Sequence, residues 1–401
     1  MSYFEWSTIL FVALGSLLIA TSITRAGDVL FIGTNKGVFS TSLDTTTGKL
    51  SEPKLAFEIR NPSFLAQHPT LNVLYAVSET YDGKARVYAL SIDAISHALT
   101  EISSQEIGVD ADASGPCFVS ATDSALLVAN YGSGSVVSFP LDENGVPGAR
   151  ASHIKHTGSS VNASRQKEPH AHSITPAPVT NDLNNTDSNN ADSNNADSIA
   201  RFAVAADLGT DELIVYAIDA KSAVLTPHSV AKLTPGAGPR HVAFHPTLPI
   251  LFVCGELDNT LCAFAWDARA GTLSARTNVG SRVSTLPPDF IGSNSTAEVA
   301  VHPSGKFVYV SNCGHDSIAR FTFDSTTQSL SLVSTTPTQG KKPRHFSLNP
   351  SGQWMVVANQ TTGNLVVFAV DQATGELRSI NADDQAILLD SPQCVRFIRG
   401  Q

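Results

Sequence analysis

Positive charge is scarce in this sequence, and no segment concentrates it. Among 401 residues, 26 Lys and Arg stand against 36 Asp and Glu, so the formal net charge is −10. Without a basic patch the chain cannot neutralise many phosphates, which argues against a nucleic acid or an anionic membrane surface as its partner. A local basic pocket inside an otherwise acidic protein is still compatible with this composition.

Cysteine is also rare, with five scattered copies and no Cys-x-x-Cys pair. This pattern predicts neither a zinc site nor a disulfide framework, and it favours buried thiols that act as small apolar side chains. Methionine occurs only 2 times, whereas Gly and Pro occur 27 and 21 times. Such a composition suits many short strands joined by turns rather than long helices.

The N-terminus carries an almost wholly apolar run from Ile9 to Ala20, followed by small residues around Arg25. The run has the length of a signal-peptide core rather than of a membrane span, although Glu5 and the absence of Lys and Arg before it break the usual pattern. We therefore expect residues 1–26 to be a signal peptide or a membrane-anchor-like segment, with export slightly favoured over a cytoplasmic location. A retained anchor, which would bring a membrane partner, and an over-extended cytoplasmic start are open alternatives.

A short unit recurs along the rest of the chain at intervals of about 50 residues, a period typical of propellers. Each unit has an anchor that usually contains Pro, an alternating strand, a turn, and a second strand that in most copies ends in Glu, Asn or Asp. The seven anchors begin at Pro62, Pro116, Pro169, Pro239, Ala297, Pro343 and Pro392. We therefore predict that residues 27–401 form an all-β, seven-bladed β-propeller with four-stranded antiparallel blades.

Two irregularities fit this prediction. The last anchor is followed by one strand, over 394–398, so N-terminal residues such as 29–32 would complete its blade and close the ring without open edges. The third unit is longer than its neighbours because residues 181–198 form a polar, low-complexity insert rich in Asn, Asp and Ser. We expect this insert to be a disordered loop between the first and second strands of that unit.

In such a blade the start of the first strand and the end of the second lie on the same face. The anchors and strand ends should therefore surround one mouth of the central channel. Their side chains include His170, His172, Arg240, His241, Arg344 and His345 from the anchors, and Glu79, Asn130, Asp207 and Glu256 from the strand ends. Burying so much charge without a purpose is costly, so the cluster predicts a functional site.

Several of these polar residues also have a purely structural interpretation. Asn130 and Asp207 could simply cap turns, a role that Asn and Asp often take. The His-Pro pairs at His68, His245 and His302 should lie on the opposite face and be structural. The Gly-rich stretch from Gly132 to Ser135 is a hairpin turn rather than a nucleophile elbow, because no helix is expected to follow it.

The ordered motifs resemble the lactonase family of seven-bladed propellers, which includes propeller-type 6-phosphogluconolactonases and carboxymuconate-lactonizing enzymes. The resemblance covers nearly the whole chain after residue 28. It rests on segments such as Pro169-His170-Ala171-His172-Ser173, Gly238-Pro239-Arg240-His241 with Glu256, and Pro343-Arg344-His345 with Ala358-Asn359-Gln360. In the muconate-lactonizing members the proposed site has one His, two Arg and one Glu. The resemblance therefore implies His170 or His172, Arg240, Arg344 and Glu256.

We expect a lactonase similar to 6-phosphogluconolactonase that needs no metal or other cofactor and takes a lactone bearing a phosphate or a carboxylate. Glu256 is the expected general base, His170 or His172 the general acid, and Arg240 the group that stabilises the oxyanion. Substrate binding is expected from Arg344, His345, His241, Asn130 and Asp207. The His170-Ala171-His172 pair is a weak metal motif. Two alternatives remain open: a 3-carboxy-cis,cis-muconate cyclase and a non-catalytic binding scaffold.

Overall fold

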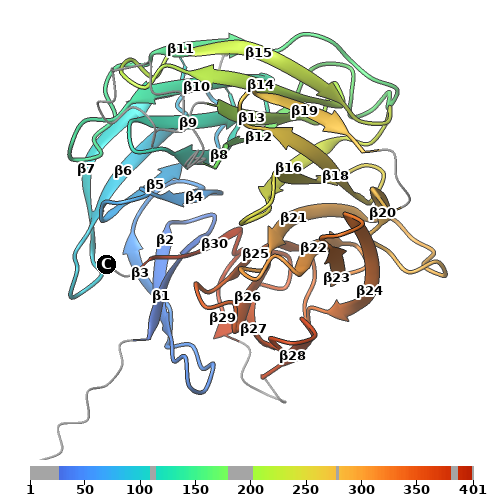
Figure 1. Cartoon of the computed structure of the whole chain (residues 1–401). Coiled ribbons are helices and arrows are strands. Elements are labelled where there is room, and N and C mark those ends of the chain that lie inside the picture. The colour runs from blue at the N-terminus through green and yellow to red at the C-terminus, as the bar shows by residue number, and fades with distance from the viewer. Residues whose placement is uncertain (1–26, 109–113, 179–201, 277–279, 381–386, 400–401) are drawn as a thin grey trace, which may run out of the picture.

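The computed structural model describes residues 27–108, 114–178, 202–276, 280–380 and 387–399. Within these ranges all regular structure is β-strand, so no helix long and apolar enough to cross a membrane occurs there. Seven antiparallel sheets, each with four strands along its main path, surround a common centre (Figure 1). The predicted seven-bladed β-propeller is confirmed.

The blades are numbered in chain order, and their strands are listed from the innermost outward. Blade 1 consists of β30 (Cys394–Phe397), β1 (Asp28–Gly33), β2 (Val38–Leu43) and β3 (Lys54–Phe57). Blade 2 consists of β4 (Leu65–Gln67), β5 (Val73–Val77), β6 (Arg86–Ile92) and β7 (Leu99–Glu106). Blade 3 consists of β8 (Pro116–Ala121), β9 (Ala125–Asn130), β10 (Ser135–Pro140) and β11 (Ser152–Lys155). Blade 4 consists of β12 (Ala171–Pro176), β13 (Phe202–Asp207), β14 (Glu212–Ile218) and β15 (Leu225–Lys232).

The last three blades follow the same plan, and two of them carry a short extra strand. Blade 5 consists of β16 (Pro239–Phe244), β17 (Ile250–Gly255), β18 (Thr260–Asp267) and β19 (Thr272–Ala275), with β20 (Arg282–Ser284) also paired to β18. Blade 6 consists of β21 (Ser295–Val301), β22 (Phe307–Cys313), β23 (Ser317–Asp324) and β24 (Ser329–Pro337). Blade 7 consists of β25 (Pro343–Leu348), β26 (Trp354–Asn359), β27 (Asn364–Val370) and β28 (Leu377–Ser379), with β29 (Ile387–Leu388) also paired to β27.

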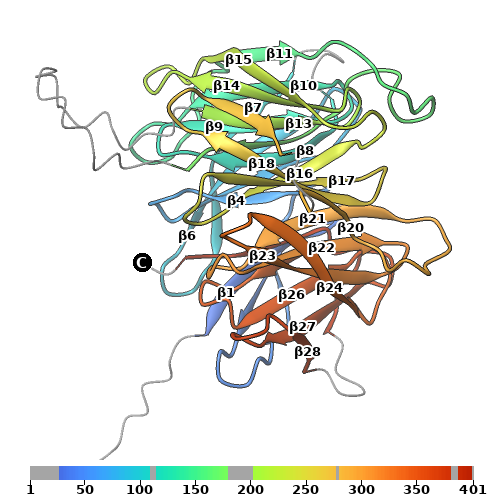
Figure 2. The same cartoon turned by 45° about the vertical axis from the view of Figure 1, so that its right-hand side comes forward.

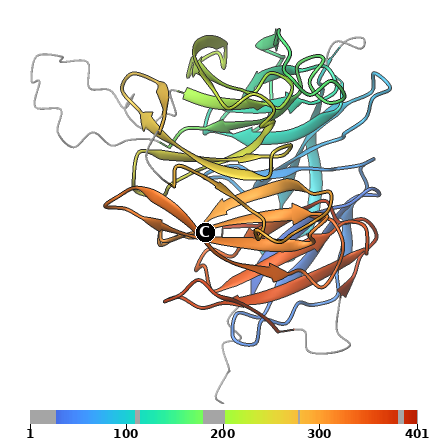
Figure 3. The same cartoon turned by 90° about the vertical axis from the view of Figure 1, so that its right-hand side faces the viewer.

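The innermost strands form a closed ring. Each contacts the innermost strands of its two neighbours, and β30 contacts both β25 and β4. The closure itself is an antiparallel pairing of β30 with β1, in a register that sets Leu30 opposite Phe397 and Gly33 opposite Cys394. The blue start and the red end of the chain accordingly lie side by side in Figure 1, Figure 2 and Figure 3. The predicted closure by N- and C-terminal strands is therefore confirmed.

The hydrophobic core lies between neighbouring blades. The second strand of a blade is covered on both faces, so strands such as β9, β17 and β26 are buried at every position and read as continuous apolar runs. Fully burying one such Val or Leu side chain contributes about 1.5–3 kcal/mol. Large aromatic residues on these second strands are also buried, and their hydroxyl groups have partners: Tyr75 on β5 donates to the carbonyl of Gly145, and Tyr309 on β22 to that of Gly375.

The His-Pro turns lie at the other end of the innermost strands from the anchors, as predicted. The Nδ1 atom of His245 accepts the backbone N–H of Leu248 at 2.9 Å, which closes its own turn. Its Nε2 atom lies 3.1 Å from the carbonyl of Gly305, in the equivalent turn of the next blade. His302 makes the same link to Gly352 at 3.2 Å. These histidines therefore connect adjacent blades and have a structural role.

Two sequence predictions fall outside the described residues. The signal-peptide or anchor-like segment, residues 1–26, is one, and the polar insert, residues 181–198, is the other. The strands on either side of the insert, β12 and β13, pair directly with each other, with Thr175 opposite Val204.

The outer hairpins repeat a turn in which an Asp side chain accepts backbone N–H groups. Asp93, for example, accepts from Ile95 and Ser96, and these bonds lower the pKa of its carboxyl group. The residue four positions after the Asp has a positive φ, which favours glycine. Three copies, Gly48, Gly271 and Gly375, have glycine there, whereas blade 2 has His97 at φ 56°.

Replacing His97 by glycine should therefore stabilise the protein. A left-handed conformation is strained for a residue with a Cβ, so His97→Gly is expected to raise the free energy of unfolding by roughly 0.5–1 kcal/mol. Urea unfolding measures the change. The control His97→Ala keeps the strained Cβ, and an equal gain in that variant would contradict the explanation.

Candidate active site

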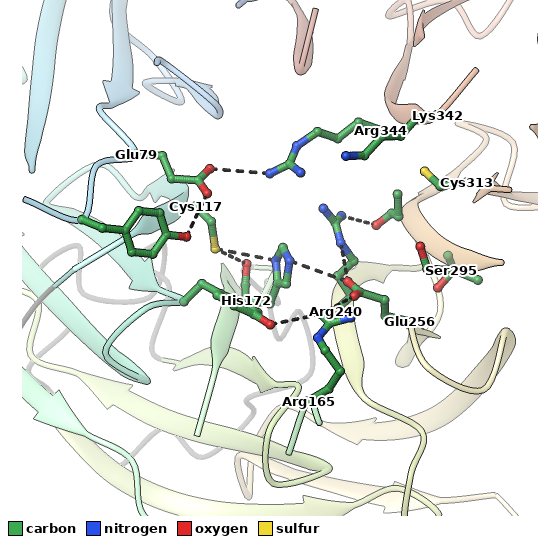
Figure 4. A pocket seen from close by; sticks show the side chains of 14 residues that line it. Glu79, Cys117, Arg165, His172, Arg240, Glu256, Ser295, Cys313, Lys342 and Arg344 are labelled. Atoms are coloured by element: carbon green, nitrogen blue, oxygen red, sulfur yellow. Dashed lines mark hydrogen bonds and ion pairs between the residues drawn. The ribbon is translucent and has the colours of Figure 1, made fainter. Parts of the chain in front are cut away.

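A cavity of about 290 Å³ opens at the anchor end of the innermost strands (Figure 4). Its lining comes from blades 2 to 7 and from the loop between β11 and β12. The lining residues are Glu79, Tyr81, Cys117, Tyr131, Arg165, His172, Arg240, Glu256, Ser295, Thr296, Ala297, Cys313, Lys342 and Arg344. Four of the predicted site residues, His172, Arg240, Glu256 and Arg344, are thus brought together.

A β-bulge near the start of the innermost strand decides which side chains reach the cavity. The pairing register shifts between Pro239 and Val242 in blade 5, and similar shifts occur in blades 3, 4, 6 and 7. A bulge adds a residue to one strand and redirects the side chains beside it. In blade 5 it buries two consecutive side chains: Arg240 lines the cavity, and His241 lies in the channel below it.

Glu256 is the most heavily paired group of the cavity. Its Oε1 atom accepts a hydrogen bond from Arg165 Nη2 at 2.7 Å, and its Oε2 atom lies 3.0 Å from Arg240 Nε. His172 Nε2 lies 3.8 Å from the same Oε2 atom, which is beyond direct hydrogen-bond reach. One carboxylate therefore stands between two guanidinium groups and an imidazole, as Figure 4 shows.

Arg240 is held by the protein on three sides. Besides its contact with Glu256, its Nη1 atom donates to the carbonyl of Ala297 and to His241 Nε2, the latter at 3.3 Å. The guanidinium has five N–H donors in a planar fork, so this arrangement leaves the two on Nη2 for a ligand. The side chain is almost completely buried, which makes it a fixed donor rather than a mobile surface charge.

A second charged group lies across the cavity. Arg344 Nη2 is 3.5 Å from Glu79 Oε2, and Tyr81 donates its hydroxyl to Glu79 Oε1 at 3.3 Å. Lys342 reaches the same side of the cavity (Figure 4). In total, the lining holds four cationic side chains and two carboxylates. The excess positive charge suits an anionic ligand, although the whole chain is acidic.

His172 is neutral in this environment. Burial lowers the pKa of its imidazole well below the usual value, and the nearby charge of Arg240 adds to the effect. A neutral imidazole accepts or donates a hydrogen bond but is not a ready source of an acidic proton. Cys117 Sγ lies 3.6 Å from its Nδ1 atom, and burial raises the pKa of that thiol, so it stays protonated.

Two further predicted residues, His241 and His345, lie in the channel below the cavity and do not line it. Both contact Glu298 Oε2, His241 through Nδ1 at 2.8 Å and His345 through Nε2 at 3.2 Å. The rings of Phe64 and Phe118 pack edge-on against this group. The sequence did not predict that Arg240 and Arg344 line the cavity while His241 and His345 lie below it, because no sequence pattern marks the bulge that offsets these residues.

The other predicted residues lie outside the cavity lining. His170 stacks on Tyr131, and its Nδ1 atom is 2.9 Å from that residue's backbone oxygen. Asn130 is fully buried and donates to Ser135 Oγ at 3.1 Å. Asp207 accepts the N–H groups of the turn that follows it and binds His156 Nδ1 at 2.6 Å. The contacts of Asn130 and Asp207 fit the turn-capping interpretation.

Sequence reasoning missed Arg165 and Lys342. Arg165 belongs to an irregular loop, 156–170, that has no counterpart in the repeat. Asp211 fixes this loop by accepting a hydrogen bond from Gln166 Nε2 at 2.8 Å. Lys342 occupies the position before an anchor Pro, and a basic side chain at that position could have indicated a residue of the cavity. No group of three or more His, Cys, Asp and Glu in the described ranges is arranged to hold a metal ion.

The buried histidines predict how stability depends on pH. Burial lowers the pKa of His172 and His241 well below the usual value, and that of His345 to about 3. Below pH 6.5 these histidines bind protons in the unfolded chain but stay neutral in the folded protein. The free energy of unfolding therefore falls as the pH drops. We expect up to about 1.4 kcal/mol per pH unit for each histidine between pH 7 and 5.

Urea unfolding at several pH values measures this slope. His345→Gln removes one of the three groups, so its slope should be smaller than that of the wild type by about one histidine's share. A wild-type slope near zero, or an unchanged slope in the variant, would contradict a neutral, buried set of histidines.

Comparison with known proteins agrees with this architecture. The family model "Lactonase, 7-bladed beta-propeller" matches residues 17–190 and 181–397. The chain is 36% identical to the 6-phosphogluconolactonase of Bacillus subtilis over 91% of its own length and 95% of the relative's. It is 28% identical to the 6-phosphogluconolactonase of Formosa agariphila, over 86% and 91%. The structure of the Pseudomonas aeruginosa periplasmic gluconolactonase superposes with a TM-score of 0.80 at 26% identity, over 93% and 99%. The chain belongs to the family of seven-bladed β-propeller lactonases.

Proposed function

We propose that the cavity hydrolyses a phosphorylated sugar lactone, as a 6-phosphogluconolactonase does. The observation that carries this proposal is the cavity's charge, four cations against two carboxylates in a chain of net charge −10. Such a local excess attracts an anionic substrate. Family membership and the 36% identical relative support the reaction type.

Hydrolysis of a lactone needs an activated water, a donor for the oxyanion and a proton for the leaving alkoxide. We assign the first task to Glu256. A water held beside Glu256 Oε2 and His172 Nε2, which lie 3.8 Å apart, attacks the lactone carbonyl while the carboxylate takes its proton. His172 orients this water through a neutral imidazole.

The two N–H groups on Arg240 Nη2 then stabilise the oxyanion. Because Ala297, His241 and Glu256 already fix the guanidinium, no reorganisation is needed as negative charge develops. When the ring C–O bond breaks, the protonated Glu256 returns its proton to the leaving alkoxide. This balance needs no imidazolium, which agrees with the neutral state of His172.

The substrate's phosphate is assigned to Arg344 and Lys342, which lie together on the side of the cavity away from Glu256 in Figure 4. A guanidinium binds two phosphate oxygens at once, and an ammonium adds a point charge. Glu79 holds Arg344 in place at 3.5 Å. The lactone carbonyl would thus lie near Arg240 and the phosphate near blade 7.

Backbone strain supports a functional role for Lys342. The residue before the anchor Pro has a positive φ in several blades, and Gly115 and Gly238 adopt it at 61° and 62°. Asn61, Ser391 and Lys342 adopt φ 50°, 49° and 59° at the equivalent position although each carries a side chain, and of these three Lys342 lines the cavity. Its N–H donates to Asp316 Oδ1 at 2.8 Å, which helps to hold this conformation. Strain of this kind concentrates at functional sites.

We also propose export, on the basis of the apolar run from Ile9 to Ala20, which lies outside the described ranges. The location of the protein bears on its substrate. The structural neighbour from Pseudomonas aeruginosa is named a periplasmic gluconolactonase, and that name refers to a lactone without a phosphate. An assay of phosphorylated and unphosphorylated lactones therefore tests the phosphate assignment directly.

Glu256→Gln should abolish most lactonase activity, because the amide cannot take the water's proton. We expect kcat/KM for 6-phosphogluconolactone to fall by roughly 100-fold or more with the fold intact. The control is Glu212→Gln, which breaks an ion pair with Lys232 on the outer part of blade 4. Equal activity in the two variants would refute the role of Glu256.

The same assay separates the competing functions. Wild-type protein is offered 6-phosphogluconolactone, gluconolactone and 3-carboxy-cis,cis-muconate. Turnover of the muconate alone would favour a cyclase, and turnover of none would favour a binding scaffold. Rapid turnover of the phosphorylated lactone supports the proposal.

Lys342→Gly should separate stability from function. Glycine relieves the strained φ, so the free energy of unfolding is expected to rise by roughly 0.5–1 kcal/mol. Loss of the ammonium should raise KM for the phosphorylated lactone about tenfold, and leave KM for the unphosphorylated one unchanged within about twofold. Lys232→Gly, distant from the cavity, is the control for the kinetics. An equal rise in KM for both lactones would contradict the phosphate assignment.

A further inference from the structure

Directly below the cavity lies a buried group of two histidines and one glutamate, of which the proposed reaction uses only the contact between His241 and Arg240. Glu298 Oε2 is 2.8 Å from His241 Nδ1 and 3.2 Å from His345 Nε2. His241 and His345 are nearly inaccessible, with 3% and 5% of the residue surface exposed. The three residues come from three different blades, on β16, β21 and β25.

The two outer ends of this group are both hydrogen-bond donors. At one end, Arg240 Nη1 lies 3.3 Å from His241 Nε2, and a guanidinium can only donate. At the other end, the backbone N–H of Val395 on β30 lies 3.3 Å from His345 Nδ1, and an amide nitrogen can only donate. His241 Nε2 and His345 Nδ1 must therefore both be acceptors without a hydrogen.

This requirement fixes where the remaining hydrogens lie. A neutral imidazole has one N–H, so His241 carries it on Nδ1 and His345 carries it on Nε2. Both N–H groups then point at Glu298 Oε2. The position between them needs one oxygen that accepts two hydrogen bonds, which a carboxylate provides. Burial raises the pKa of this carboxyl group above its usual value, and the positive charges of Arg240 and Arg396 counteract that rise.

We propose that Glu298 is a positioning residue for Arg240: by accepting both imidazole N–H groups, it keeps His241 Nε2 free to accept from Arg240 Nη1. The resulting chain runs from the backbone of β30 through His345, Glu298 and His241 to Arg240. Its effect on turnover rests on the proposed function, whereas the hydrogen positions do not.

The consequence for the cavity follows from the geometry of the guanidinium. If His241 carried its hydrogen on Nε2, two donors would face each other across 3.3 Å. Arg240 would then rotate away, and its contacts through Nε with Glu256 and through Nη2 with the oxyanion would change together. Since these contacts matter most in the transition state, misplacement lowers kcat more than it raises KM.

The first test observes the hydrogens directly. In the full chain labelled with ¹⁵N-histidine, the nitrogen shifts are assigned with His241→Gln and His345→Gln. We expect His241 as the Nδ1–H tautomer and His345 as the Nε2–H tautomer at neutral pH. The opposite tautomer at His241 would overturn the proposal, whether or not the protein hydrolyses lactones.

The second test compares two substitutions of the same residue. Glu298→Gln keeps an oxygen that accepts two hydrogen bonds, so kcat should stay within about threefold of the wild type. Glu298→Leu removes the acceptor, so kcat should fall about tenfold or more while KM changes less than about threefold. The matched pair Glu212→Gln and Glu212→Leu controls for loss of a carboxylate elsewhere.

The outcomes separate this proposal from the proposed function. If the wild type hydrolyses no lactone, the proposed function fails and the tautomers alone decide the role of Glu298. If Glu298→Leu keeps full kcat, or loses it together with Glu298→Gln despite wild-type tautomers, the positioning role is wrong. If Glu298→Leu does not fold, the wild-type tautomers and the kcat of Glu298→Gln still decide it.

Discussion

The pairing of β30 with β1 is the interaction on which the rest of the molecule depends. It joins Cys394 to Gly33 and Phe397 to Leu30, so strands from both ends of the chain share one blade. Only with that pairing do seven innermost strands form a ring without a free edge. The cavity needs the ring, because its lining is contributed by six different blades and one loop.

Within the ring, bulges place consecutive side chains of the anchors at two levels, one in the cavity and one in the channel beneath it. Arg240 and Arg344 face the cavity, whereas the residues that follow them, His241 and His345, face the channel beneath. The upper level is charged and open to substrate. The lower level is a buried hydrogen-bond network that ends on Arg240. Adjacent residues of the same strands therefore form the floor of the cavity and the guanidinium groups that line it.

The sequence predicted the fold well because the repeat carries it: seven anchors and the strand pattern specify blades, their number and their closure. The same reasoning placed His172, Arg240, Glu256 and Arg344 together, since equivalent positions of a circular repeat converge. It could not place Arg165, which reaches Glu256 from a non-repeating loop. It also could not predict that His241 and His345 lie below the cavity, because a bulge depends on backbone register rather than on residue type.

The closing pair also has a kinetic consequence. Residues that meet in blade 1, such as Gly33 and Cys394, are separated by nearly the whole described chain. The hydrogen bond from Arg399 N to Gln67 Oε1, which links the end of blade 1 to blade 2, spans 332 positions. Contacts this remote are reached late, since the intervening chain must first be ordered. Once these closing contacts have formed, they must break before the ring can open at this point. We therefore expect a slow unfolding rate to protect the native state, so that its lifetime under heat or protease measures its robustness better than its equilibrium stability does.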